Sequence, residues 1–235
     1  MKNVRWAALA VALLTAVSLT SCRNPTQPPS GTPSGKTPVV FINGYILTPA
    51  MWDSFVAYLK TQGYTSGDIM NVGYVSTGAN AVSATEGAAQ LAQRVDQILA
   101  ATGKSKVDIV GHSLGNLMIK ACIVEGGCAG KVDHWENVAG AQNGTTIANA
   151  CFDPACPDMR LGSALIRRLQ AADDAAISSQ GVKVQVHWTQ NDGVINPVRN
   201  SFETYATNIE VPGLNHLNIS DSRKVQQDTV AFFNS

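Results

Sequence analysis

The sequence has 235 residues, of which 45% are hydrophobic and 14% are charged, and its 17 basic residues balance 17 acidic ones. This length and apolar content predict one ordinary globular domain with a sizeable core. Because the chain has no basic tract, the composition argues against nucleic acid as a partner and favours uncharged substrates.

The first 21 residues are organised like a bacterial export signal. Lys2 and Arg5 precede an apolar stretch from Trp6 to about Val17, and small residues follow it. The stretch is too short for a comfortable membrane span, which needs roughly 20 apolar residues. We therefore expect residues 1–21 to be removed as a signal peptide. Without Lys2 and Arg5, the 17 basic residues become 15 against 17 acidic ones, a formal net charge of −2.

Cys22 ends the segment Leu-Thr-Ser-Cys, which resembles a bacterial lipobox, where the cysteine is acylated and becomes the mature N-terminus. The alternative is an ordinary cleaved signal with an incidental cysteine. Stable anchoring needs more than one acyl chain, so an acylated Cys22 would carry several. We expect an exported protein that is lipid-anchored to a bacterial membrane and faces outside the cytoplasm, or is secreted if the lipobox is not used.

Residues 22–36 are rich in Pro, Gly, Ser and Thr and contain no apolar residue to bury. This composition predicts a flexible tether that holds a folded domain, residues 37–235, away from the membrane.

Alternating strand and helix patterns run through residues 37–235. Dense apolar runs predict buried parallel strands, and apolar residues at helical spacing predict helices. The predicted strands are residues 37–43, 68–72, 106–110, 133–138, 182–189 and a weaker 208–211, and the predicted helices are residues 51–62, 85–101, 114–124 and 225–233. This alternation indicates an α/β fold with a mostly parallel sheet of about six strands and helices on both faces.

Four cysteines remain after Cys22, an even number in a chain that is expected to reach an oxidising compartment. Cys151 and Cys156 flank a proline-containing loop, and Cys122 and Cys128 bracket a predicted helix end. Of the three possible pairings we prefer these two local disulfides. A zinc site is a weaker alternative because the spacings lack the usual paired ligands, and free thiols are another.

Gly111-His112-Ser113-Leu114-Gly115 fits the pattern G-x-S-x-G between a predicted strand and a predicted helix. In a nucleophile elbow, this tight turn pushes the serine side chain out above the sheet, and the glycines leave room for the backbone. The motif alone occurs by chance, but here both flanks match. We therefore predict Ser113 as a nucleophile, with a glycine-rich turn of no catalytic role as the alternative.

A serine nucleophile needs a general base and a third group that orients this base. Of the histidines after Ser113, His134 comes too early in the chain and His187 lies within a predicted strand. His216 lies in the loop before the last helix and is the predicted base. Asp192 lies in the turn directly after a strand and is the predicted acid. The weaker candidates for the acid are Asp153, Asp158, Asp173 and Asp174.

The tetrahedral intermediate of acyl transfer needs backbone N–H donors aimed at its oxyanion. The predicted donors are Leu114, directly after the nucleophile, and Tyr45, in the turn after the first strand. Tyr45 and Trp188 are also candidates for substrate binding. An apolar acyl site could be lined by Tyr45, Met51, Trp52, Leu114 and Trp188, although core packing is favoured for Met51, Trp52 and Trp188.

Four segments together resemble the small bacterial class 2 lipases and esterases of the α/β-hydrolase superfamily. They are residues 38–44 (Pro-Val-Val-Phe-Ile-Asn-Gly), 111–116 (Gly-His-Ser-Leu-Gly-Asn), 191–197 (Asn-Asp-Gly-Val-Ile-Asn-Pro) and 215–216 (Asn-His). The resemblance covers most of the chain from Thr37 onward. It implies a triad of Ser113, Asp192 and His216 that hydrolyses acyl esters through an acyl-enzyme, with no metal or other cofactor.

One difference from this family is Asn43-Gly44, where relatives usually have His-Gly. Because the oxyanion donors are main-chain groups, this change need not abolish activity, but it changes the hydrogen bonds of the loop.

Residues 141–180 are the only insertion large enough for a cap, and we expect the cysteine loop to make it rigid, with no large swinging lid. Short to medium acyl esters are the expected substrates, and hydrophobic polyesters are an extension that depends on Tyr45 as an aromatic clamp. Two other functions fit the same residues, an acyltransferase that uses the same serine and a non-catalytic surface lipoprotein. We expect a monomer that meets an ester or lipid substrate and, through Cys22, a membrane.

Overall fold

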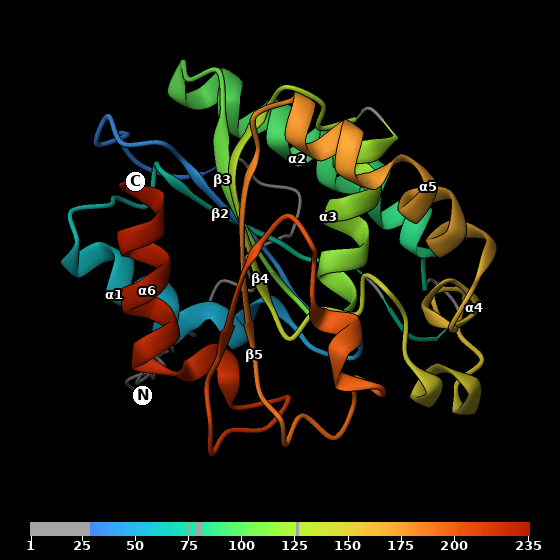
Figure 1. The fold of residues 1–235 in the computed structure, drawn as a ribbon. Coiled ribbons are helices and arrows are strands. Elements are labelled where there is room, and N and C mark those ends of the chain that lie inside the picture. The colour runs from blue at the N-terminus through green and yellow to red at the C-terminus, as the bar shows by residue number, and fades with distance from the viewer. Residues whose placement is uncertain (1–28, 75, 79–80, 126) are drawn as a thin grey trace, which may run out of the picture.

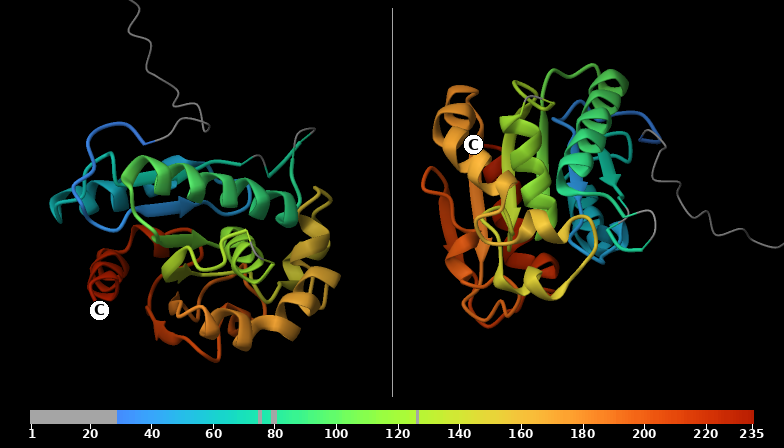
Figure 2. Two further views of the ribbon diagram at one scale, coloured as in Figure 1. Left: turned by 90° about the horizontal axis from the view of Figure 1, so that it is seen from above. Right: turned by 90° about the vertical axis from the view of Figure 1, so that its right-hand side faces the viewer.

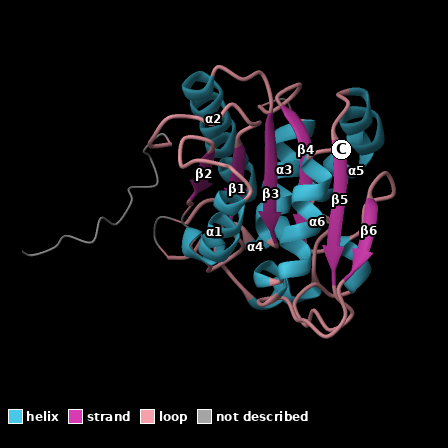
Figure 3. Ribbon diagram, turned by 90° about the vertical axis from the view of Figure 1, so that its left-hand side faces the viewer, coloured by secondary structure: helices cyan, strands magenta, loops and turns pink. Residues whose placement is uncertain are grey.

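The computed structural model describes residues 29–74, 76–78, 81–125 and 127–235, without the side chains of residues 173–175 (Figure 1). It contains a six-stranded parallel sheet in the order β2-β1-β3-β4-β5-β6 (Figure 3). The strands are β1 (Val39–Ile42), β2 (Ile69–Val72), β3 (Val107–His112), β4 (Val132–Val138), β5 (Lys183–Trp188) and β6 (Thr207–Glu210). Each corresponds to a predicted strand. Because all six run in one direction, their carboxyl ends meet at one edge of the sheet, called the carboxyl edge below.

Helices cover both faces of this sheet (Figures 1 and 2). They are α1 (Asp53–Thr61), α2 (Ala84–Thr102), α3 (Leu114–Val124), α4 (Cys156–Met159), α5 (Ala164–Ser179) and α6 (Arg223–Phe233). Four 3₁₀ turns complete the described elements: η1 (Pro49–Trp52), η2 (Thr146–Ala150), η3 (Val198–Ser201) and η4 (Ile219–Asp221). One apolar core lies between the sheet and α2, α3 and α5, and a second lies between the sheet and α1 and α6. The predicted α/β-hydrolase fold is confirmed.

The central elements are those whose sequences lack an amphipathic pattern. All residues of β1 and β3 are buried, because helices cover both sides of these strands. Helix α3 is buried from Leu114 to Ile123, since it packs between α2, α5 and the sheet. Even Lys120 is fully buried, and its ammonium forms a 2.9 Å ion pair with Glu203. The nucleophile motif thus joins two deeply buried elements of the fold.

Residues 141–180 are not one insertion, because residues 164–179 form α5, so the prediction of a cap over this whole range was wrong. Much of this region is α5, whose Leu165, Ile166, Leu169 and Ile177 are buried in the same core as α3. It is the crossover helix that a parallel connection from β4 to β5 requires. The apolar residues of α5 occur at helical spacing, so the helix could have been recognised. The shorter segments η2 and α4, which come before it, follow the carboxyl end of β4.

Two disulfides join Cys122 to Cys128 and Cys151 to Cys156, with Cα–Cα distances of 5.1 and 5.7 Å. They are the two local pairs that the cysteine spacing favours, so the zinc and free-thiol alternatives are wrong. The first pair closes the end of α3, and the second closes the loop that leads into α4.

The predicted signal peptide, Cys22 and residues 23–28 of the predicted tether lie outside the described residues. Within the remainder of the tether, the Ser34 amide donates to Asp68 Oδ1 at 2.9 Å, and the Thr65 hydroxyl donates to the Thr32 carbonyl at 2.7 Å. Residues 32–34 therefore contact the loop that precedes β2. Among the described residues, no helix is both long and apolar enough to cross a membrane.

Candidate active site

The predicted functional residues converge at the carboxyl edge of the sheet. Ser113 follows β3, Tyr45 follows β1, Asp192 follows β5 and His216 follows β6. In α/β proteins, sites form outside the carboxyl ends of parallel strands, because the loops there approach one another from several strands. Residues that lie far apart in the sequence are thereby brought to one place.

Ser113 lies in a strained turn between β3 and α3. Its φ and ψ angles are 52° and −122°, a backbone conformation that residues other than glycine rarely adopt. The turn is held from the adjacent strand, because the Ser113 amide donates to the Val138 carbonyl at 3.1 Å and the Ala141 amide donates to the Ser113 carbonyl at 3.0 Å. This geometry is that of the predicted nucleophile elbow.

Three glycines allow the backbone to approach this serine closely. A Cβ atom on Gly111 would collide with the side chain of Asn116, and one on Gly115 would lie 2.8 Å from the Asn43 carbonyl oxygen. A Cβ atom on Gly44 would lie 2.9 Å from Ser113 Cβ. The first two glycines belong to the motif. Gly44 lies outside the motif, and its close approach to Ser113 depends on the contact between the loops after β1 and β3.

His216 and Asp192 form a buried pair. His216 Nδ1 donates to Asp192 Oδ2 at 3.0 Å, and Asp192 Oδ1 accepts the amides of Val194 and Ile195 at 3.0 and 2.6 Å. Burial alone raises the pKa of the Asp192 carboxyl, but the bonds from His216 and the two amides outweigh burial and hold this pKa below its usual range. The carboxylate is therefore ionised and fixes the His216 ring with Nε2 as its free nitrogen.

His112, the residue before Ser113, supports His216 in a way that the sequence did not reveal. Its Nε2 lies 2.8 Å from the His216 carbonyl oxygen, and the two ring centroids are 4.7 Å apart. Complete burial, and next the nearby charge of His216, lower the pKa of His112 to about 3. His112 is therefore neutral near pH 7, and its Nε2–H donates to the carbonyl oxygen. Its position inside G-x-S-x-G was the one available signal.

The two predicted oxyanion donors have free amides. Among the described residues, the amide nitrogens of Tyr45 and Leu114 donate to no protein acceptor. The loop that carries Tyr45 is closed by Asn43, whose Nδ2 donates to the carbonyls of Leu47 and Gly44 at 2.6 and 3.1 Å. Asn43 thus stabilises the loop that follows β1.

The alternative acids and bases whose side chains are described have other hydrogen-bond partners. Asp153 accepts a hydrogen bond from the Tyr45 hydroxyl, and Asp158 accepts one from the Ala84 amide at the start of α2. His187 lies in β5 and is hydrogen-bonded to Glu136. The side chains of Asp173 and Asp174 are outside the described set. Of the predicted acids, Asp192 is the one that the structure pairs with His216.

The residues proposed to line an acyl site divide into two groups. Trp52 is fully buried and stacks with Phe41 at 5.1 Å, and Met51 packs against the same core, so both are core residues. Trp188 is partly buried and packs against Phe202 with ring centroids 4.7 Å apart. Its role in substrate binding stays a prediction.

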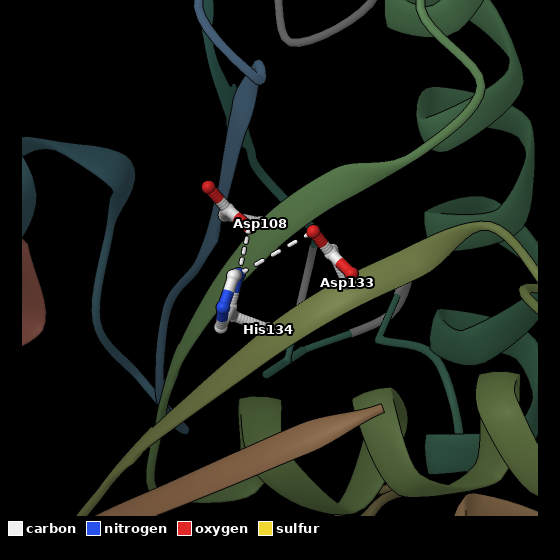
Figure 4. Close-up of side chains that lie close together, drawn as sticks. All are labelled: Asp108, Asp133 and His134. Atoms are coloured by element: carbon white, nitrogen blue, oxygen red, sulfur yellow. Dashed lines mark hydrogen bonds and ion pairs between the residues drawn. The ribbon is translucent and has the colours of Figure 1, made fainter. Parts of the chain in front are cut away.

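A second cluster of ionisable groups lies at the opposite edge of the sheet (Figure 4). His134 Nδ1 is 2.7 Å from Asp108 Oδ1 and 3.8 Å from Asp133 Oδ2, a spacing that could hold a metal ion. However, the Lys106 ammonium lies 3.4 Å from Asp133 and supplies a positive charge, and His134 Nδ1 is already hydrogen-bonded. We interpret this cluster as a structural Asp–His pair that is separate from the serine site.

Comparisons with known proteins agree with this geometry. The profile of the family described as Lipase (class 2) matches residues 36–232. The mature form of the Bacillus licheniformis lipase BlEst2 has a similar structure, with a TM-score of 0.72 at 14% identity over 88% of this chain and 96% of that one. Aspergillus fumigatus lipase B also has a TM-score of 0.72, at 12% identity over 89% of this chain and 56% of that one. A Rhodococcus esterase has a TM-score of 0.59 at 18% identity over 87% and 92% of the two chains.

Proposed function

This chain belongs to the class 2 lipase family and is a carboxylic ester hydrolase, and on that premise we propose that Ser113 is its nucleophile. The observation that carries the proposal is the buried Asp192–His216 pair, whose histidine contacts His112, the residue before Ser113 in the strained elbow. The elbow presents the hydroxyl, and the pair supplies a base of defined orientation.

In the proposed reaction, His216 Nε2 takes the proton from the Ser113 hydroxyl as its oxygen bonds to the acyl carbon. The bond from this carbon to the alcohol oxygen then breaks, and His216 returns the proton to the alcohol. Water adds to the acyl-enzyme with the same base and releases the acid. Asp192 stabilises the positive charge that His216 carries between these transfers.

The amides of Tyr45 and Leu114 are the proposed oxyanion donors. Negative charge develops on the acyl oxygen only in the transition state, so donors already fixed there lower the barrier without tightening ground-state binding. Leu114 is the first residue of α3, where the helix dipole also favours negative charge. The loss of one such donor commonly lowers kcat on the order of 10²- to 10³-fold.

A fluorophosphonate probe tests this mechanism directly. The probe should modify the wild-type protein once, and peptide mapping should place the adduct on Ser113. A folded Ser113→Ala variant should remain unlabelled. If a folded wild type is not labelled, the chain is a non-catalytic member of the family.

Apolar side chains around the site favour water-insoluble, uncharged esters. Among the described residues, all large apolar side chains that are exposed lie in segments at the carboxyl edge, and we call them the apolar rim. They are Ile46, Ile147, Phe152, Leu161 and Leu217. Residues 43–52, 141–152 and 211–218 of this edge contain no Lys, Arg, Asp or Glu. These three segments can meet an uncharged lipid surface without desolvating charges, whereas Leu161 lies directly beside Arg160.

Adsorption to a triglyceride emulsion should depend on this rim. The inactive Ser113→Ala protein allows binding to be measured by flotation without hydrolysis. Adding Phe152→Asn should weaken adsorption on the order of 10-fold, because Phe152 is 89% exposed and would bury its ring in the droplet. The control substitution is Tyr58→Asn on α1, which should leave adsorption unchanged. Equal weakening by both substitutions would argue against the rim.

We also propose that the domain is held at a membrane by acylation of Cys22. The support is the lipobox-like segment that ends at Cys22. Replacing Cys22 with alanine should move the protein from the membrane to the soluble fraction on cell fractionation. An unchanged membrane fraction would contradict the anchor.

A further inference from the structure

We propose that Asp153, held in the disulfide-closed loop Cys151–Cys156, is a positioning residue for the oxyanion donor Tyr45. The inference rests on the proposed function, because it assumes that the Tyr45 amide binds the oxyanion. It assigns a part in the reaction to a loop that lies about a hundred residues from Tyr45 in the sequence.

The carboxylate of Asp153 bridges two loops at the carboxyl edge. The Tyr45 hydroxyl donates to Asp153 Oδ2 at 2.5 Å, and the Gly78 amide donates to Asp153 Oδ1 at 3.1 Å. The bond to Asp153, and next burial, raise the pKa of Tyr45 to about 12. Tyr45 therefore keeps its proton and remains a donor throughout the pH range in which a serine hydrolase works.

The loop that carries Asp153 has anchoring contacts of its own, and its Cys156 Sγ also lies 3.9 Å from the Tyr45 hydroxyl. Its disulfide holds Cys151 and Cys156 at a Cα–Cα distance of 5.7 Å, and Cys156 is fully buried. The Cys156 amide donates to the Asp153 carbonyl at 2.9 Å, and Arg160 donates to the Cys151 carbonyl at 3.2 Å. Asp153 is thus presented by a rigid frame, which is what a positioning group requires.

The backbone around Tyr45 needs such a support. Gly44 lies directly before Tyr45. Only glycine fits there, because a Cβ atom would lie 2.6 Å from His112 Nδ1. Ile46, directly after Tyr45, has a φ of 57° and its amide is held by the Ser76 hydroxyl at 2.8 Å. The side-chain bond to Asp153 joins Tyr45 itself to the frame. Without this bond the amide would sample more orientations, and an oxyanion donor acts only when it is aimed in advance.

Four variants and one control test the proposal on a soluble nitrophenyl ester. Tyr45→Phe removes only the hydroxyl, and Asp153→Ala removes its acceptor. Each should lower kcat about 10-fold, less than the full loss of a donor, with KM changed by less than about threefold. The combined variant should be no slower than either single one, because both remove the same bond. Asp158→Asn, just beyond the same loop, should keep the wild-type kcat.

Asp153→Asn supplies the conservative comparison, because its amide oxygen can still accept from Tyr45. It should therefore retain more of kcat than Asp153→Ala. If the losses in Tyr45→Phe and Asp153→Ala multiply in the combined variant, or if KM rises while kcat is unchanged, the two residues do not act through one bond and the proposal fails. If the Asp153→Ala variant does not fold, Tyr45→Phe is sufficient as a test. A wild-type kcat in Tyr45→Phe would then overturn the proposal.

Fluorophosphonate labelling separates this inference from the proposed function. A wild type that is labelled at Ser113, with variants of unchanged kcat, would overturn the positioning role only. A folded wild type that is not labelled would remove the proposed function and this inference together.

Discussion

Replacing Asp192 with asparagine is expected to lower kcat about 10⁴-fold with the fold intact. Asp192 Oδ2 accepts from His216 Nδ1, which leaves Nε2 free to take the proton of Ser113. An amide at this position can donate to Nδ1 and favour the opposite tautomer, in which Nε2 carries the proton and cannot act as a base. The measurement is the steady-state hydrolysis of a soluble nitrophenyl ester.

Asp221→Asn is the control for this prediction. Asp221 is an exposed acid in η4, five residues beyond His216, and should be replaceable without loss of kcat. If Asp192→Asn retained kcat within tenfold of wild type, another group would have to orient His216. The unfolding midpoint of each variant should be measured alongside, so that loss of structure is not mistaken for loss of chemistry.

Replacing Glu136 with alanine is expected to lower the free energy of unfolding by about 3–5 kcal/mol. Glu136 is fully buried in β4, and its carboxylate accepts from His187 at 2.8 Å, Gln185 at 2.9 Å and Thr229 at 3.1 Å. Without the Glu136 carboxylate, the polar groups of His187 and Gln185 on β5 and of Thr229 on α6 stay buried and lose this acceptor. Denaturant unfolding measures the change, and the exposed pair of Glu125 with Arg168 gives a control, since Glu125→Ala should cost no more than about 1 kcal/mol.

The effect of Glu136 should also depend on pH. Burial tends to lower the pKa of His187, but the charges and hydrogen bonds of Glu136 and Asp228 outweigh it and raise this pKa above the usual value. A raised folded-state pKa contributes stability that is fully present below the unfolded pKa of about 6.5 and is lost as the pH rises through the folded value. The stability difference between wild type and Glu136→Ala should therefore shrink at alkaline pH. A difference that grew with pH would contradict a charged His187.

The candidate nucleophile, acid and base could all be located from the sequence, because each lies beside a local landmark. Ser113 lies between a buried strand and a buried helix, and Asp192 and His216 lie directly after strands. Helix α5 is absent from the predicted core helices, although its apolar residues repeat at helical spacing, because residues 141–180 are predicted as an insertion that could form a cap.

Most strands and helices, the two local disulfides and the candidate triad could be predicted from the sequence alone. Each of these features has a local signal in the sequence, in the form of apolar spacing, glycines or turn residues. The support of His216 by His112, the bond from Tyr45 to Asp153 and the network around Glu136 could not be predicted before the fold was known. Each of these contacts joins residues that are distant in the sequence and come together only when the loops and strands pack. Local sequence patterns do not predict such contacts.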